Sequence, residues 1–229
     1  MPPTQCLLLA NSAALATSIG AAAVYLAFVQ SPPTLERMVA KTASTTLLSA
    51  TTVIRNGPSL LALALAFGSL GDAFLAWDDD NNEDDTKFLF GLASFLVAHL
   101  FYIAVFWRST GSNGKRKSLF SGWRAVPAGV LVLFVSIMLA SLVPQLESDL
   151  RVPVIGYSAV IFVMAQSALT LEHHQVIAGS LLFAASDSIL AADRFLVPTH
   201  SPYRVWMQYA VWVLYYAGQL LIALGLTPL

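Results

Sequence analysis

Charged residues are scarce in this chain. Only 11% of its 229 residues are Asp, Glu, Lys or Arg, whereas 57% are hydrophobic; soluble domains carry roughly 25% charged residues. The net charge of −1 provides no electrostatic attraction to phosphate backbones, so we expect no nucleic-acid partner. The composition is typical of a protein that crosses a membrane several times.

Cysteine is nearly missing too. Cys6 stands alone, which excludes an intramolecular disulfide framework and a thiolate metal cluster. His173 and His174 are adjacent, and neighbours on a helix point about 100° apart, so a catalytic zinc site is poorly supported. Phosphate-binding loops and Gly-x-Ser-x-Gly elbows are also missing from the sequence. We therefore expect neither a metal nor a cofactor.

Long apolar runs dominate what is present. A bilayer core of roughly 30 Å needs about 20 apolar residues per helix. Eight segments fit, at approximately residues 6–29, 38–54, 58–77, 87–107, 124–143, 152–171, 174–196 and 203–226. The first is longer than the roughly 7–15 apolar residues of a signal peptide and lacks a basic leader, so we interpret it as a retained helix. The second, rich in Thr and Ser, is the weakest.

The links between these runs are short, often with proline or glycine at the break, as at Pro144 and Pro153. We predict an all-α polytopic membrane protein, a bundle of eight transmembrane helices forming a single domain over residues 1–229. The basic loop 108–124 favours a cytoplasmic position, which would place the acidic loop 78–85 on the other side, but Lys and Arg divide six and six between the two sides, so the orientation stays open. An endomembrane such as the endoplasmic reticulum is one candidate location, and the oligomeric state stays open.

Four ionisable residues lie within the predicted spans: Lys41, Asp72, His99 and Asp187. Such groups are costly in a membrane, usually face the bundle interior and mark functional sites. The two aspartates occupy similar contexts, "AFGSLGDAFLAWD" and "LLFAASDSILAAD". Either a four-plus-four repeat or chance similarity between Ala/Leu-rich helices accounts for this match. Antiparallel packing of the third and fourth spans would bring Asp72 near His99.

Helical spacing places polar residues on common faces. Ser69 lies one turn before Asp72, with glycines at 68 and 71 that allow close helix approach. The remaining faces carry His99 and Tyr102 in the fourth span, Ser186, Asp187 and Arg194 in the seventh, and Tyr216 and Gln219 in the eighth. The alternative for most of these side chains is a structural hydrogen bond between helices or, for the arginines, a boundary anchor.

Five motifs carry a resemblance to a known family. They are "GSLGDAFL", "FLFGLASFLVAHLFYIAVF", "VPVIGYSAVIFVMAQSAL", "GSLLFAASDSILAADRF" and "YYAGQLLIALG". In order and spacing, from about Lys41 onward, they resemble the lysoplasmalogenase (YhhN) family. The resemblance implies an eight-span fold that hydrolyses the vinyl ether bond of lysoplasmalogens, releasing a fatty aldehyde and a glycerophospho-base.

By the same resemblance, Asp72 and Asp187 occupy the family's proposed catalytic positions. Other motif positions are held by His99, Tyr102, Tyr157, Tyr216 and Gln219. The chain departs from the family where Lys41 is followed by Thr42 instead of the frequent proline, and the loops 78–85 and 111–117 look like insertions.

We expect Asp72 and Asp187 to share acid and base roles in ether hydrolysis, with the assignment left open. Arg194 or Arg204 would hold the phosphate of a lysophospholipid substrate, and membrane lipids would surround the chain. The alternative function is a lipid or small-solute transporter that uses intramembrane carboxylates. A third interpretation is a lipid-binding protein without catalysis.

Overall fold

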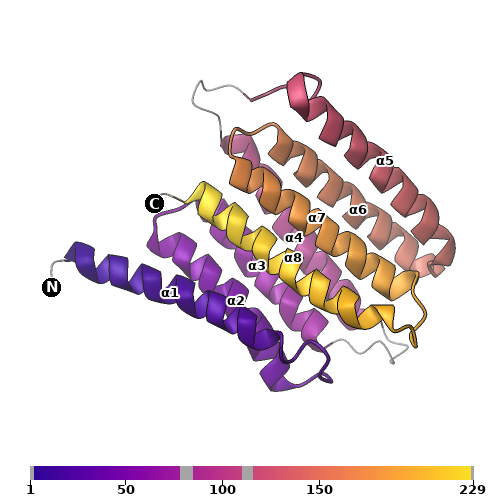
Figure 1. Cartoon of the computed structure of the whole chain (residues 1–229), viewed down its shortest axis with the longest axis horizontal. Helices are drawn as coiled ribbons and strands as arrows, with labels where there is room; N and C mark the ends of the chain where they lie inside the picture. Colours follow the sequence, from indigo (N-terminus) through magenta and orange to yellow (C-terminus); the bar gives the residue numbers. More distant parts are fainter. Residues whose placement is uncertain (1–2, 78–84, 110–115, 228–229) are drawn as a thin grey trace. The chain divides into compact units, whose positions relative to one another are not determined.

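The computed structural model describes residues 3–77, 85–109 and 116–227, and within these ranges the chain is helical without strands. The α-helices there are α1 (Pro3–Tyr25), α2 (Leu35–Ile54), α3 (Ser59–Trp77), α4 (Thr86–Arg108), α5 (Ala125–Leu142), α6 (Ser148–Leu169), α7 (His174–Phe195) and α8 (Tyr203–Leu226) (Figure 1). Short 3-10 turns at Gly122–Arg124 and Val143–Gln145 flank α5. Most of the acidic loop 78–85 and of the basic insertion 111–117 lies outside the described residues.

Each predicted segment corresponds to one helix, and the ends agree within a few residues. The prediction that Pro153 marks a break was wrong, because α6 already begins at Ser148. Proline's fixed φ suits a helix, and near the amino end it deprives only the carbonyl four residues earlier of its partner.

Six of the described helices, α3 to α8, are long and apolar enough to cross a membrane. The chain is thus built as a multi-pass membrane protein. In α1 the apolar stretch found is Ser12–Tyr25, which is shorter than these six candidate spans. The hydroxyl-rich α2 is not among these candidates, so an eight-span bundle stays a prediction.

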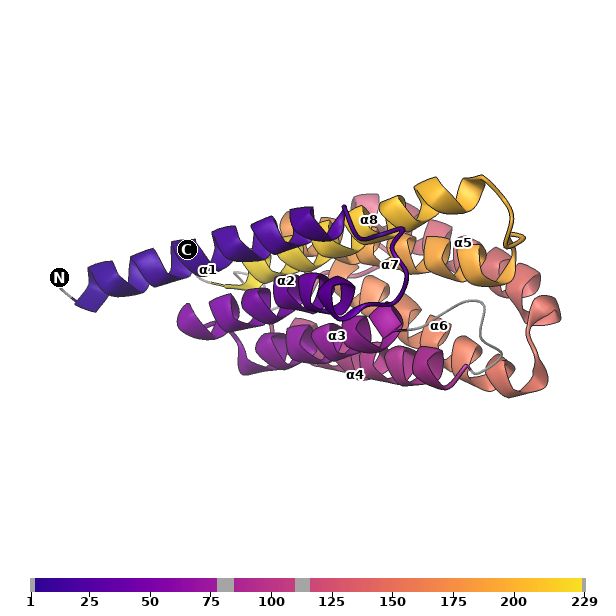
Figure 2. The same ribbon diagram turned by 90° about the horizontal axis from the view of Figure 1, so that it is seen from below.

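The helices divide into two compact units, each described by itself. The first comprises residues 1–101 with the last residues from Leu226, and the second comprises Tyr102–Gly225. In the first unit α2 lies between α1 and α3 (Figure 2). A Cβ at Gly71 of α3 would stand 2.6 Å from the ring of Phe95 in α4. The close helix approach that was predicted at Gly71 is therefore confirmed, and the structure identifies α4 as the partner.

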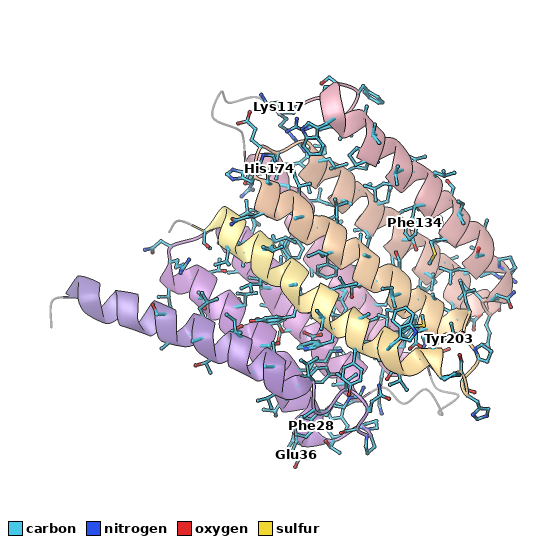
Figure 3. The ribbon with its side chains drawn as sticks, viewed as in Figure 1. Phe28, Glu36, Lys117, Phe134, His174 and Tyr203 are labelled. Atoms are coloured by element: carbon cyan, nitrogen blue, oxygen red, sulfur yellow. The ribbon has the colours of Figure 1, made fainter. Side chains whose placement is uncertain are left out.

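In the second unit α6 packs against both α5 and α7. The helix α5 carries large apolar side chains on its open side, among them Phe134 (Figure 3). Helices α7 and α8 cross where two glycines meet: a Cβ at Gly179 would lie 2.6 Å from the carbonyl oxygen of Gly218. Backbones at this crossing touch without intervening side chains.

Two arginines close the carboxyl end of α6. Arg116 donates from Nε to Thr170 Oγ1 at 2.9 Å, and Arg124 donates to the carbonyl oxygens of Leu169 at 2.8 Å and Leu171 at 3.0 Å. Partial burial lowers the pKa of Arg116 from its ordinary value. Arg124 thus satisfies carbonyls that a helix end leaves without internal partners, while Arg116 holds the Thr170 hydroxyl at the same end.

Candidate functional site

Asp72 faces an ammonium and a hydroxyl from α2. The Nζ atom of Lys41 lies 3.6 Å from its Oδ1, and Thr45 Oγ1 donates to its Oδ2 at 3.0 Å. Only 1% of Asp72 is exposed, and the Lys41 side chain is 13% exposed. Each carboxylate oxygen therefore faces a donor, an arrangement that stabilises a negative charge away from water.

A second set of hydroxyls joins α3 to α2 one turn earlier. Ser69 Oγ donates to the carbonyl oxygen of Thr42 at 3.1 Å, and Thr46 Oγ1 lies 2.6 Å from Ser69 Oγ. Because the Ser69 proton is directed at Thr42, Thr46 is the donor of this bond. Ser69 thus holds the register between the two helices and does not contact the carboxylate through these bonds.

Asp187 has a different partner. Tyr157 of α6 donates its phenol proton to Asp187 Oδ2 at 2.7 Å. Asp187 is half-buried, and its neighbour Ser186 donates to the carbonyl oxygen of Val211 in α8 at 2.8 Å. The structure therefore brings together two predicted site residues, Tyr157 and Asp187, across adjacent helices.

Tyr102 and Gln219 also meet, within the second unit. The Tyr102 hydroxyl donates to Gln219 Oε1, and both side chains are fully buried. The ring of Phe183 lies edge-on to Tyr102 at 6.3 Å between centroids and to Tyr215 at 5.2 Å. Aromatic rings thus surround the Tyr102–Gln219 pair. The polar faces predicted for α4 and α8 turn toward each other at this pair.

Two other candidates lie on buried faces. His99 is fully buried, and its Nδ1 is 2.6 Å from the carbonyl oxygen of Phe95, one turn earlier in α4. Tyr216 is buried and stacks on Trp212 at 6.1 Å. That His99 lies near Asp72 stays a prediction.

The arginines differ from one another. Arg204, at the start of α8, donates to Asp193 of α7 through Nε at 3.0 Å and Nη2 at 3.4 Å. Both side chains of this pair are largely buried. Arg194 lies half-buried in the last turn of α7. The paired Arg204 therefore joins two helices, and a phosphate contact by Arg194 stays a prediction.

Sequence reasoning missed Thr45 and the role of Asp193. Thr45 stands four residues after Lys41, so helical spacing alone could have placed both on one face. Asp193 and Arg204 flank the link between α7 and α8, where opposite charges readily meet. Among the described residues, no group of three or more His, Cys, Asp or Glu side chains could hold a metal ion.

Comparisons with known proteins place the chain among its relatives. The YhhN family model matches residues 36–226. "Lysoplasmalogenase TMEM86B" of Homo sapiens is 31% identical over 169 residues, which are 72% of this chain and 62% of the relative. "Lysoplasmalogenase" of Mycobacterium tuberculosis (strain CDC 1551 / Oshkosh) is 29% identical over 174 residues, 72% of this chain and 59% of the relative.

The match thus spans about three fifths of the length of these curated relatives. No solved structure matches the chain. The family match begins within α2 and ends with α8, so it includes both aspartates, their donors from α2 and α6, and the Tyr102–Gln219 pair. On this match over most of its length, the chain belongs to the YhhN family.

Proposed function

We propose that this chain is a membrane-embedded hydrolase that cleaves the vinyl ether bond of lysoplasmalogens, giving a fatty aldehyde and a glycerophospho-base. The observation that carries the proposal is the carboxylate of Asp72, buried in an apolar helix with Lys41 and Thr45 on its two oxygens. The names of the curated relatives support the same reaction.

The reaction requires one proton and one water. A carboxylic acid transfers its proton to the vinyl carbon β to oxygen, and the π electrons form the new C–H bond. The oxocarbenium ion that results takes up water at the carbon next to oxygen and loses a proton. The hemiacetal then breaks its carbon–oxygen bond to the glycerol, which leaves as the alcohol. Glycosidases divide similar work between two carboxyl groups, because their transition state is also oxocarbenium-like.

We assign the ionised role to Asp72. The ammonium of Lys41 and the hydroxyl of Thr45 favour a carboxylate that stabilises the cation and accepts a proton from water. Asp187 is then the proton donor, and Tyr157, bonded to Oδ2, orients its carboxyl group. In this proposal the proton is therefore carried by Asp187.

The phosphate would be held by Arg194. It follows Asp187 by seven residues, which is about 10 Å along a helix axis. That length is comparable with the distance from the vinyl carbon of a lysoplasmalogen to its phosphorus. We also propose that α1 and α2 complete eight spans, in an endomembrane such as the endoplasmic reticulum.

The test uses the full chain in detergent with lysoplasmenylethanolamine as substrate. We expect aldehyde release in the absence of any ion gradient, which separates a hydrolase from a transporter. Asp72→Asn and Asp187→Asn should each lower the rate by about 10²–10⁴-fold, the usual contribution of acid–base groups. Asp149→Asn, an exposed matched change at the start of α6, should leave the rate unchanged.

A second measurement follows the proton. Hydrolysis in D₂O, with immediate reduction of the aldehyde to the alcohol, should place one deuterium on carbon 2 of the fatty chain. Release without deuterium at that carbon contradicts protonation of the vinyl group. Aldehyde release that neither aspartate substitution affects contradicts the catalytic assignment.

A further inference from the structure

The helix α1 lies entirely outside the range that matches the family, which begins at residue 36. It nevertheless packs along α2, the helix that carries Lys41 (Figure 2). Ser18 of α1 is fully buried and donates to the carbonyl oxygen of Ser44 at 2.6 Å. Ser44 Oγ in turn donates to the carbonyl oxygen of Lys41 at 2.7 Å. A hydrogen-bonded connection therefore runs from α1 to the backbone of Lys41.

The side chain of Lys41 is contacted from α1 as well. Its Nζ lies 5.8 Å from the centroid of the Tyr25 ring and 3.6 Å from Asp72 Oδ1. An ammonium within about 6 Å of an aromatic face is attracted by the ring's negative quadrupole. Tyr25 is only 4% exposed, so little water screens this attraction. The aromatic face of Tyr25 and the carboxylate of Asp72 therefore both attract the positive charge of the Lys41 ammonium.

The position of Tyr25 is itself well held. It is the last residue of α1, and its carbonyl oxygen accepts from the amide of Phe28 at 2.8 Å. Arg37 at the start of α2 donates to the carbonyl oxygen of Ser31 at 2.8 Å, which closes the connection between the two helices. Figure 3 shows Phe28 and Glu36 in this turn. The end of α1 that carries the ring therefore has a defined place beside α2.

We infer that Tyr25 is a positioning residue, which holds the Lys41 ammonium against Asp72 and makes the amino-terminal helix part of the site. A lysine side chain has many rotamers, and an ammonium that leaves Asp72 no longer stabilises its charge. The aromatic face restricts these rotamers without contacting the substrate. The effect on catalysis rests on the proposed function, whereas the placement of Lys41 does not.

The experiment measures the placement directly. The full chain in detergent is treated with a small amine-acylating reagent, and mass spectrometry follows the modification of Lys41 against exposed Lys87 in the same molecule. Tyr25→Leu removes the ring and should raise the Lys41 modification rate about 5–10-fold, because the ammonium spends more time away from its carboxylate. Tyr25→Phe keeps the aromatic face and should match the unmodified chain.

Two further variants make the test specific. Tyr209→Leu removes a partly exposed ring from α8 and should leave Lys41 modification unchanged. Ser18→Ala, which deletes the bond to Ser44 while keeping the ring, should raise it by less than twofold. If Tyr25→Leu fails to fold, Tyr25→Met replaces it, since the flexible methionine side chain fills irregular gaps without an aromatic face.

Hydrolysis is measured on the same samples. Tyr25→Leu should lower kcat about tenfold with an unchanged KM, and Tyr25→Phe should restore kcat. Unchanged Lys41 modification in the ring-free variants, or equal effects of Leu and Phe, would overturn the inference even if the enzyme is active. Conversely, a ring-dependent modification rate in a chain that releases no aldehyde supports the inference and refutes the proposed function.

Discussion

The two aspartates at the centre of the proposed chemistry are held in unlike ways. In the first unit Asp72 is almost inaccessible, and α2 supplies an ammonium and a hydroxyl to its two oxygens. In the second unit Asp187 is half-buried, and α6 supplies the neutral phenol of Tyr157. Asp72 therefore faces an ammonium among its neighbours, and Asp187 accepts from a phenol.

The topology of the two sites is nevertheless the same. Each aspartate accepts from the helix that immediately precedes its own, α2 before α3 and α6 before α7. This correspondence agrees with the matching stretches around Asp72 and Asp187, and it favours an internal repeat over chance. Shared topology with different donors is what a division between a base and an acid would require.

The largest expected effect removes the charge from the first site. Lys41→Met leaves Asp72 buried without its ammonium, which favours the protonated carboxyl group over the carboxylate. The change should lower kcat about 10³-fold, within the usual contribution of acid–base groups. Lys41→Arg keeps a cation and should recover part of the loss. Aldehyde release by the purified variants measures both. Less than a tenfold loss in Lys41→Met would remove the distinction between the two aspartates.

The next effect concerns a second carboxylate of α7, which we interpret as structural. Arg204→Gln leaves Asp193 without its guanidinium partner and should lower the free energy of unfolding by about 3 kcal/mol. Replacing both residues by Leu should cost less than either single change. Thermal unfolding in detergent measures these effects. A raised KM at unchanged stability would instead assign Arg204 to the substrate phosphate.

A smaller effect compares helix crossings in the two units. Gly179→Ala forces a methyl group against the carbonyl oxygen of Gly218, and a backbone cannot yield without separating α7 from α8. Gly71→Ala meets the side chain of Phe95, which can rotate. We expect losses of about 2–3 and about 1 kcal/mol in unfolding free energy, respectively. Equal losses would show that the two crossings are equally tight.

The smallest effect removes the neutral donor of the second site. Tyr157→Phe deletes the bond to Asp187 and should lower kcat about 5–10-fold, since a neutral hydrogen bond contributes about 0.5–1.5 kcal/mol. Steady-state kinetics measures this change in kcat, and the KM from the same data, which should stay unchanged, serves as the internal comparison. A loss as large as that of Lys41→Met would contradict the view that orientation matters less here than charge.

The helices were predictable from sequence because apolar length and 3.6-residue periodicity act locally. The helix α2 was the exception, because its hydropathy is too low for it to be among the candidate membrane spans. Its hydroxyl-bearing residues are the reason for this low hydropathy. Thr42, Thr51 and Thr52 donate to carbonyls of their own helix, at 2.8, 2.8 and 3.1 Å. With its hydroxyls satisfied internally, a helix of low hydropathy can still be buried.

The partners within the sites were only partly predictable. Lys41, Ser69 and Asp72 were all recognised as candidates, but the register of α2 against α3, which joins Lys41 to Asp72, depends on packing between helices. The pairing of Tyr102 with Gln219 spans 117 residues of sequence, beyond the reach of any local pattern. The catalytic pairing of Asp72 with Asp187 stays a prediction.

The arginine closure of α6 has a consequence for the order of assembly. Arg116 and Arg124 precede their partners in α6 and its end by 45 to 54 residues. At roughly 5–20 residues per second, a ribosome completes those partners a few seconds to about ten seconds after it has made the arginines. Arg116 and Arg124 therefore reach these contacts only once α6 has emerged, so this closure is a late event in biogenesis.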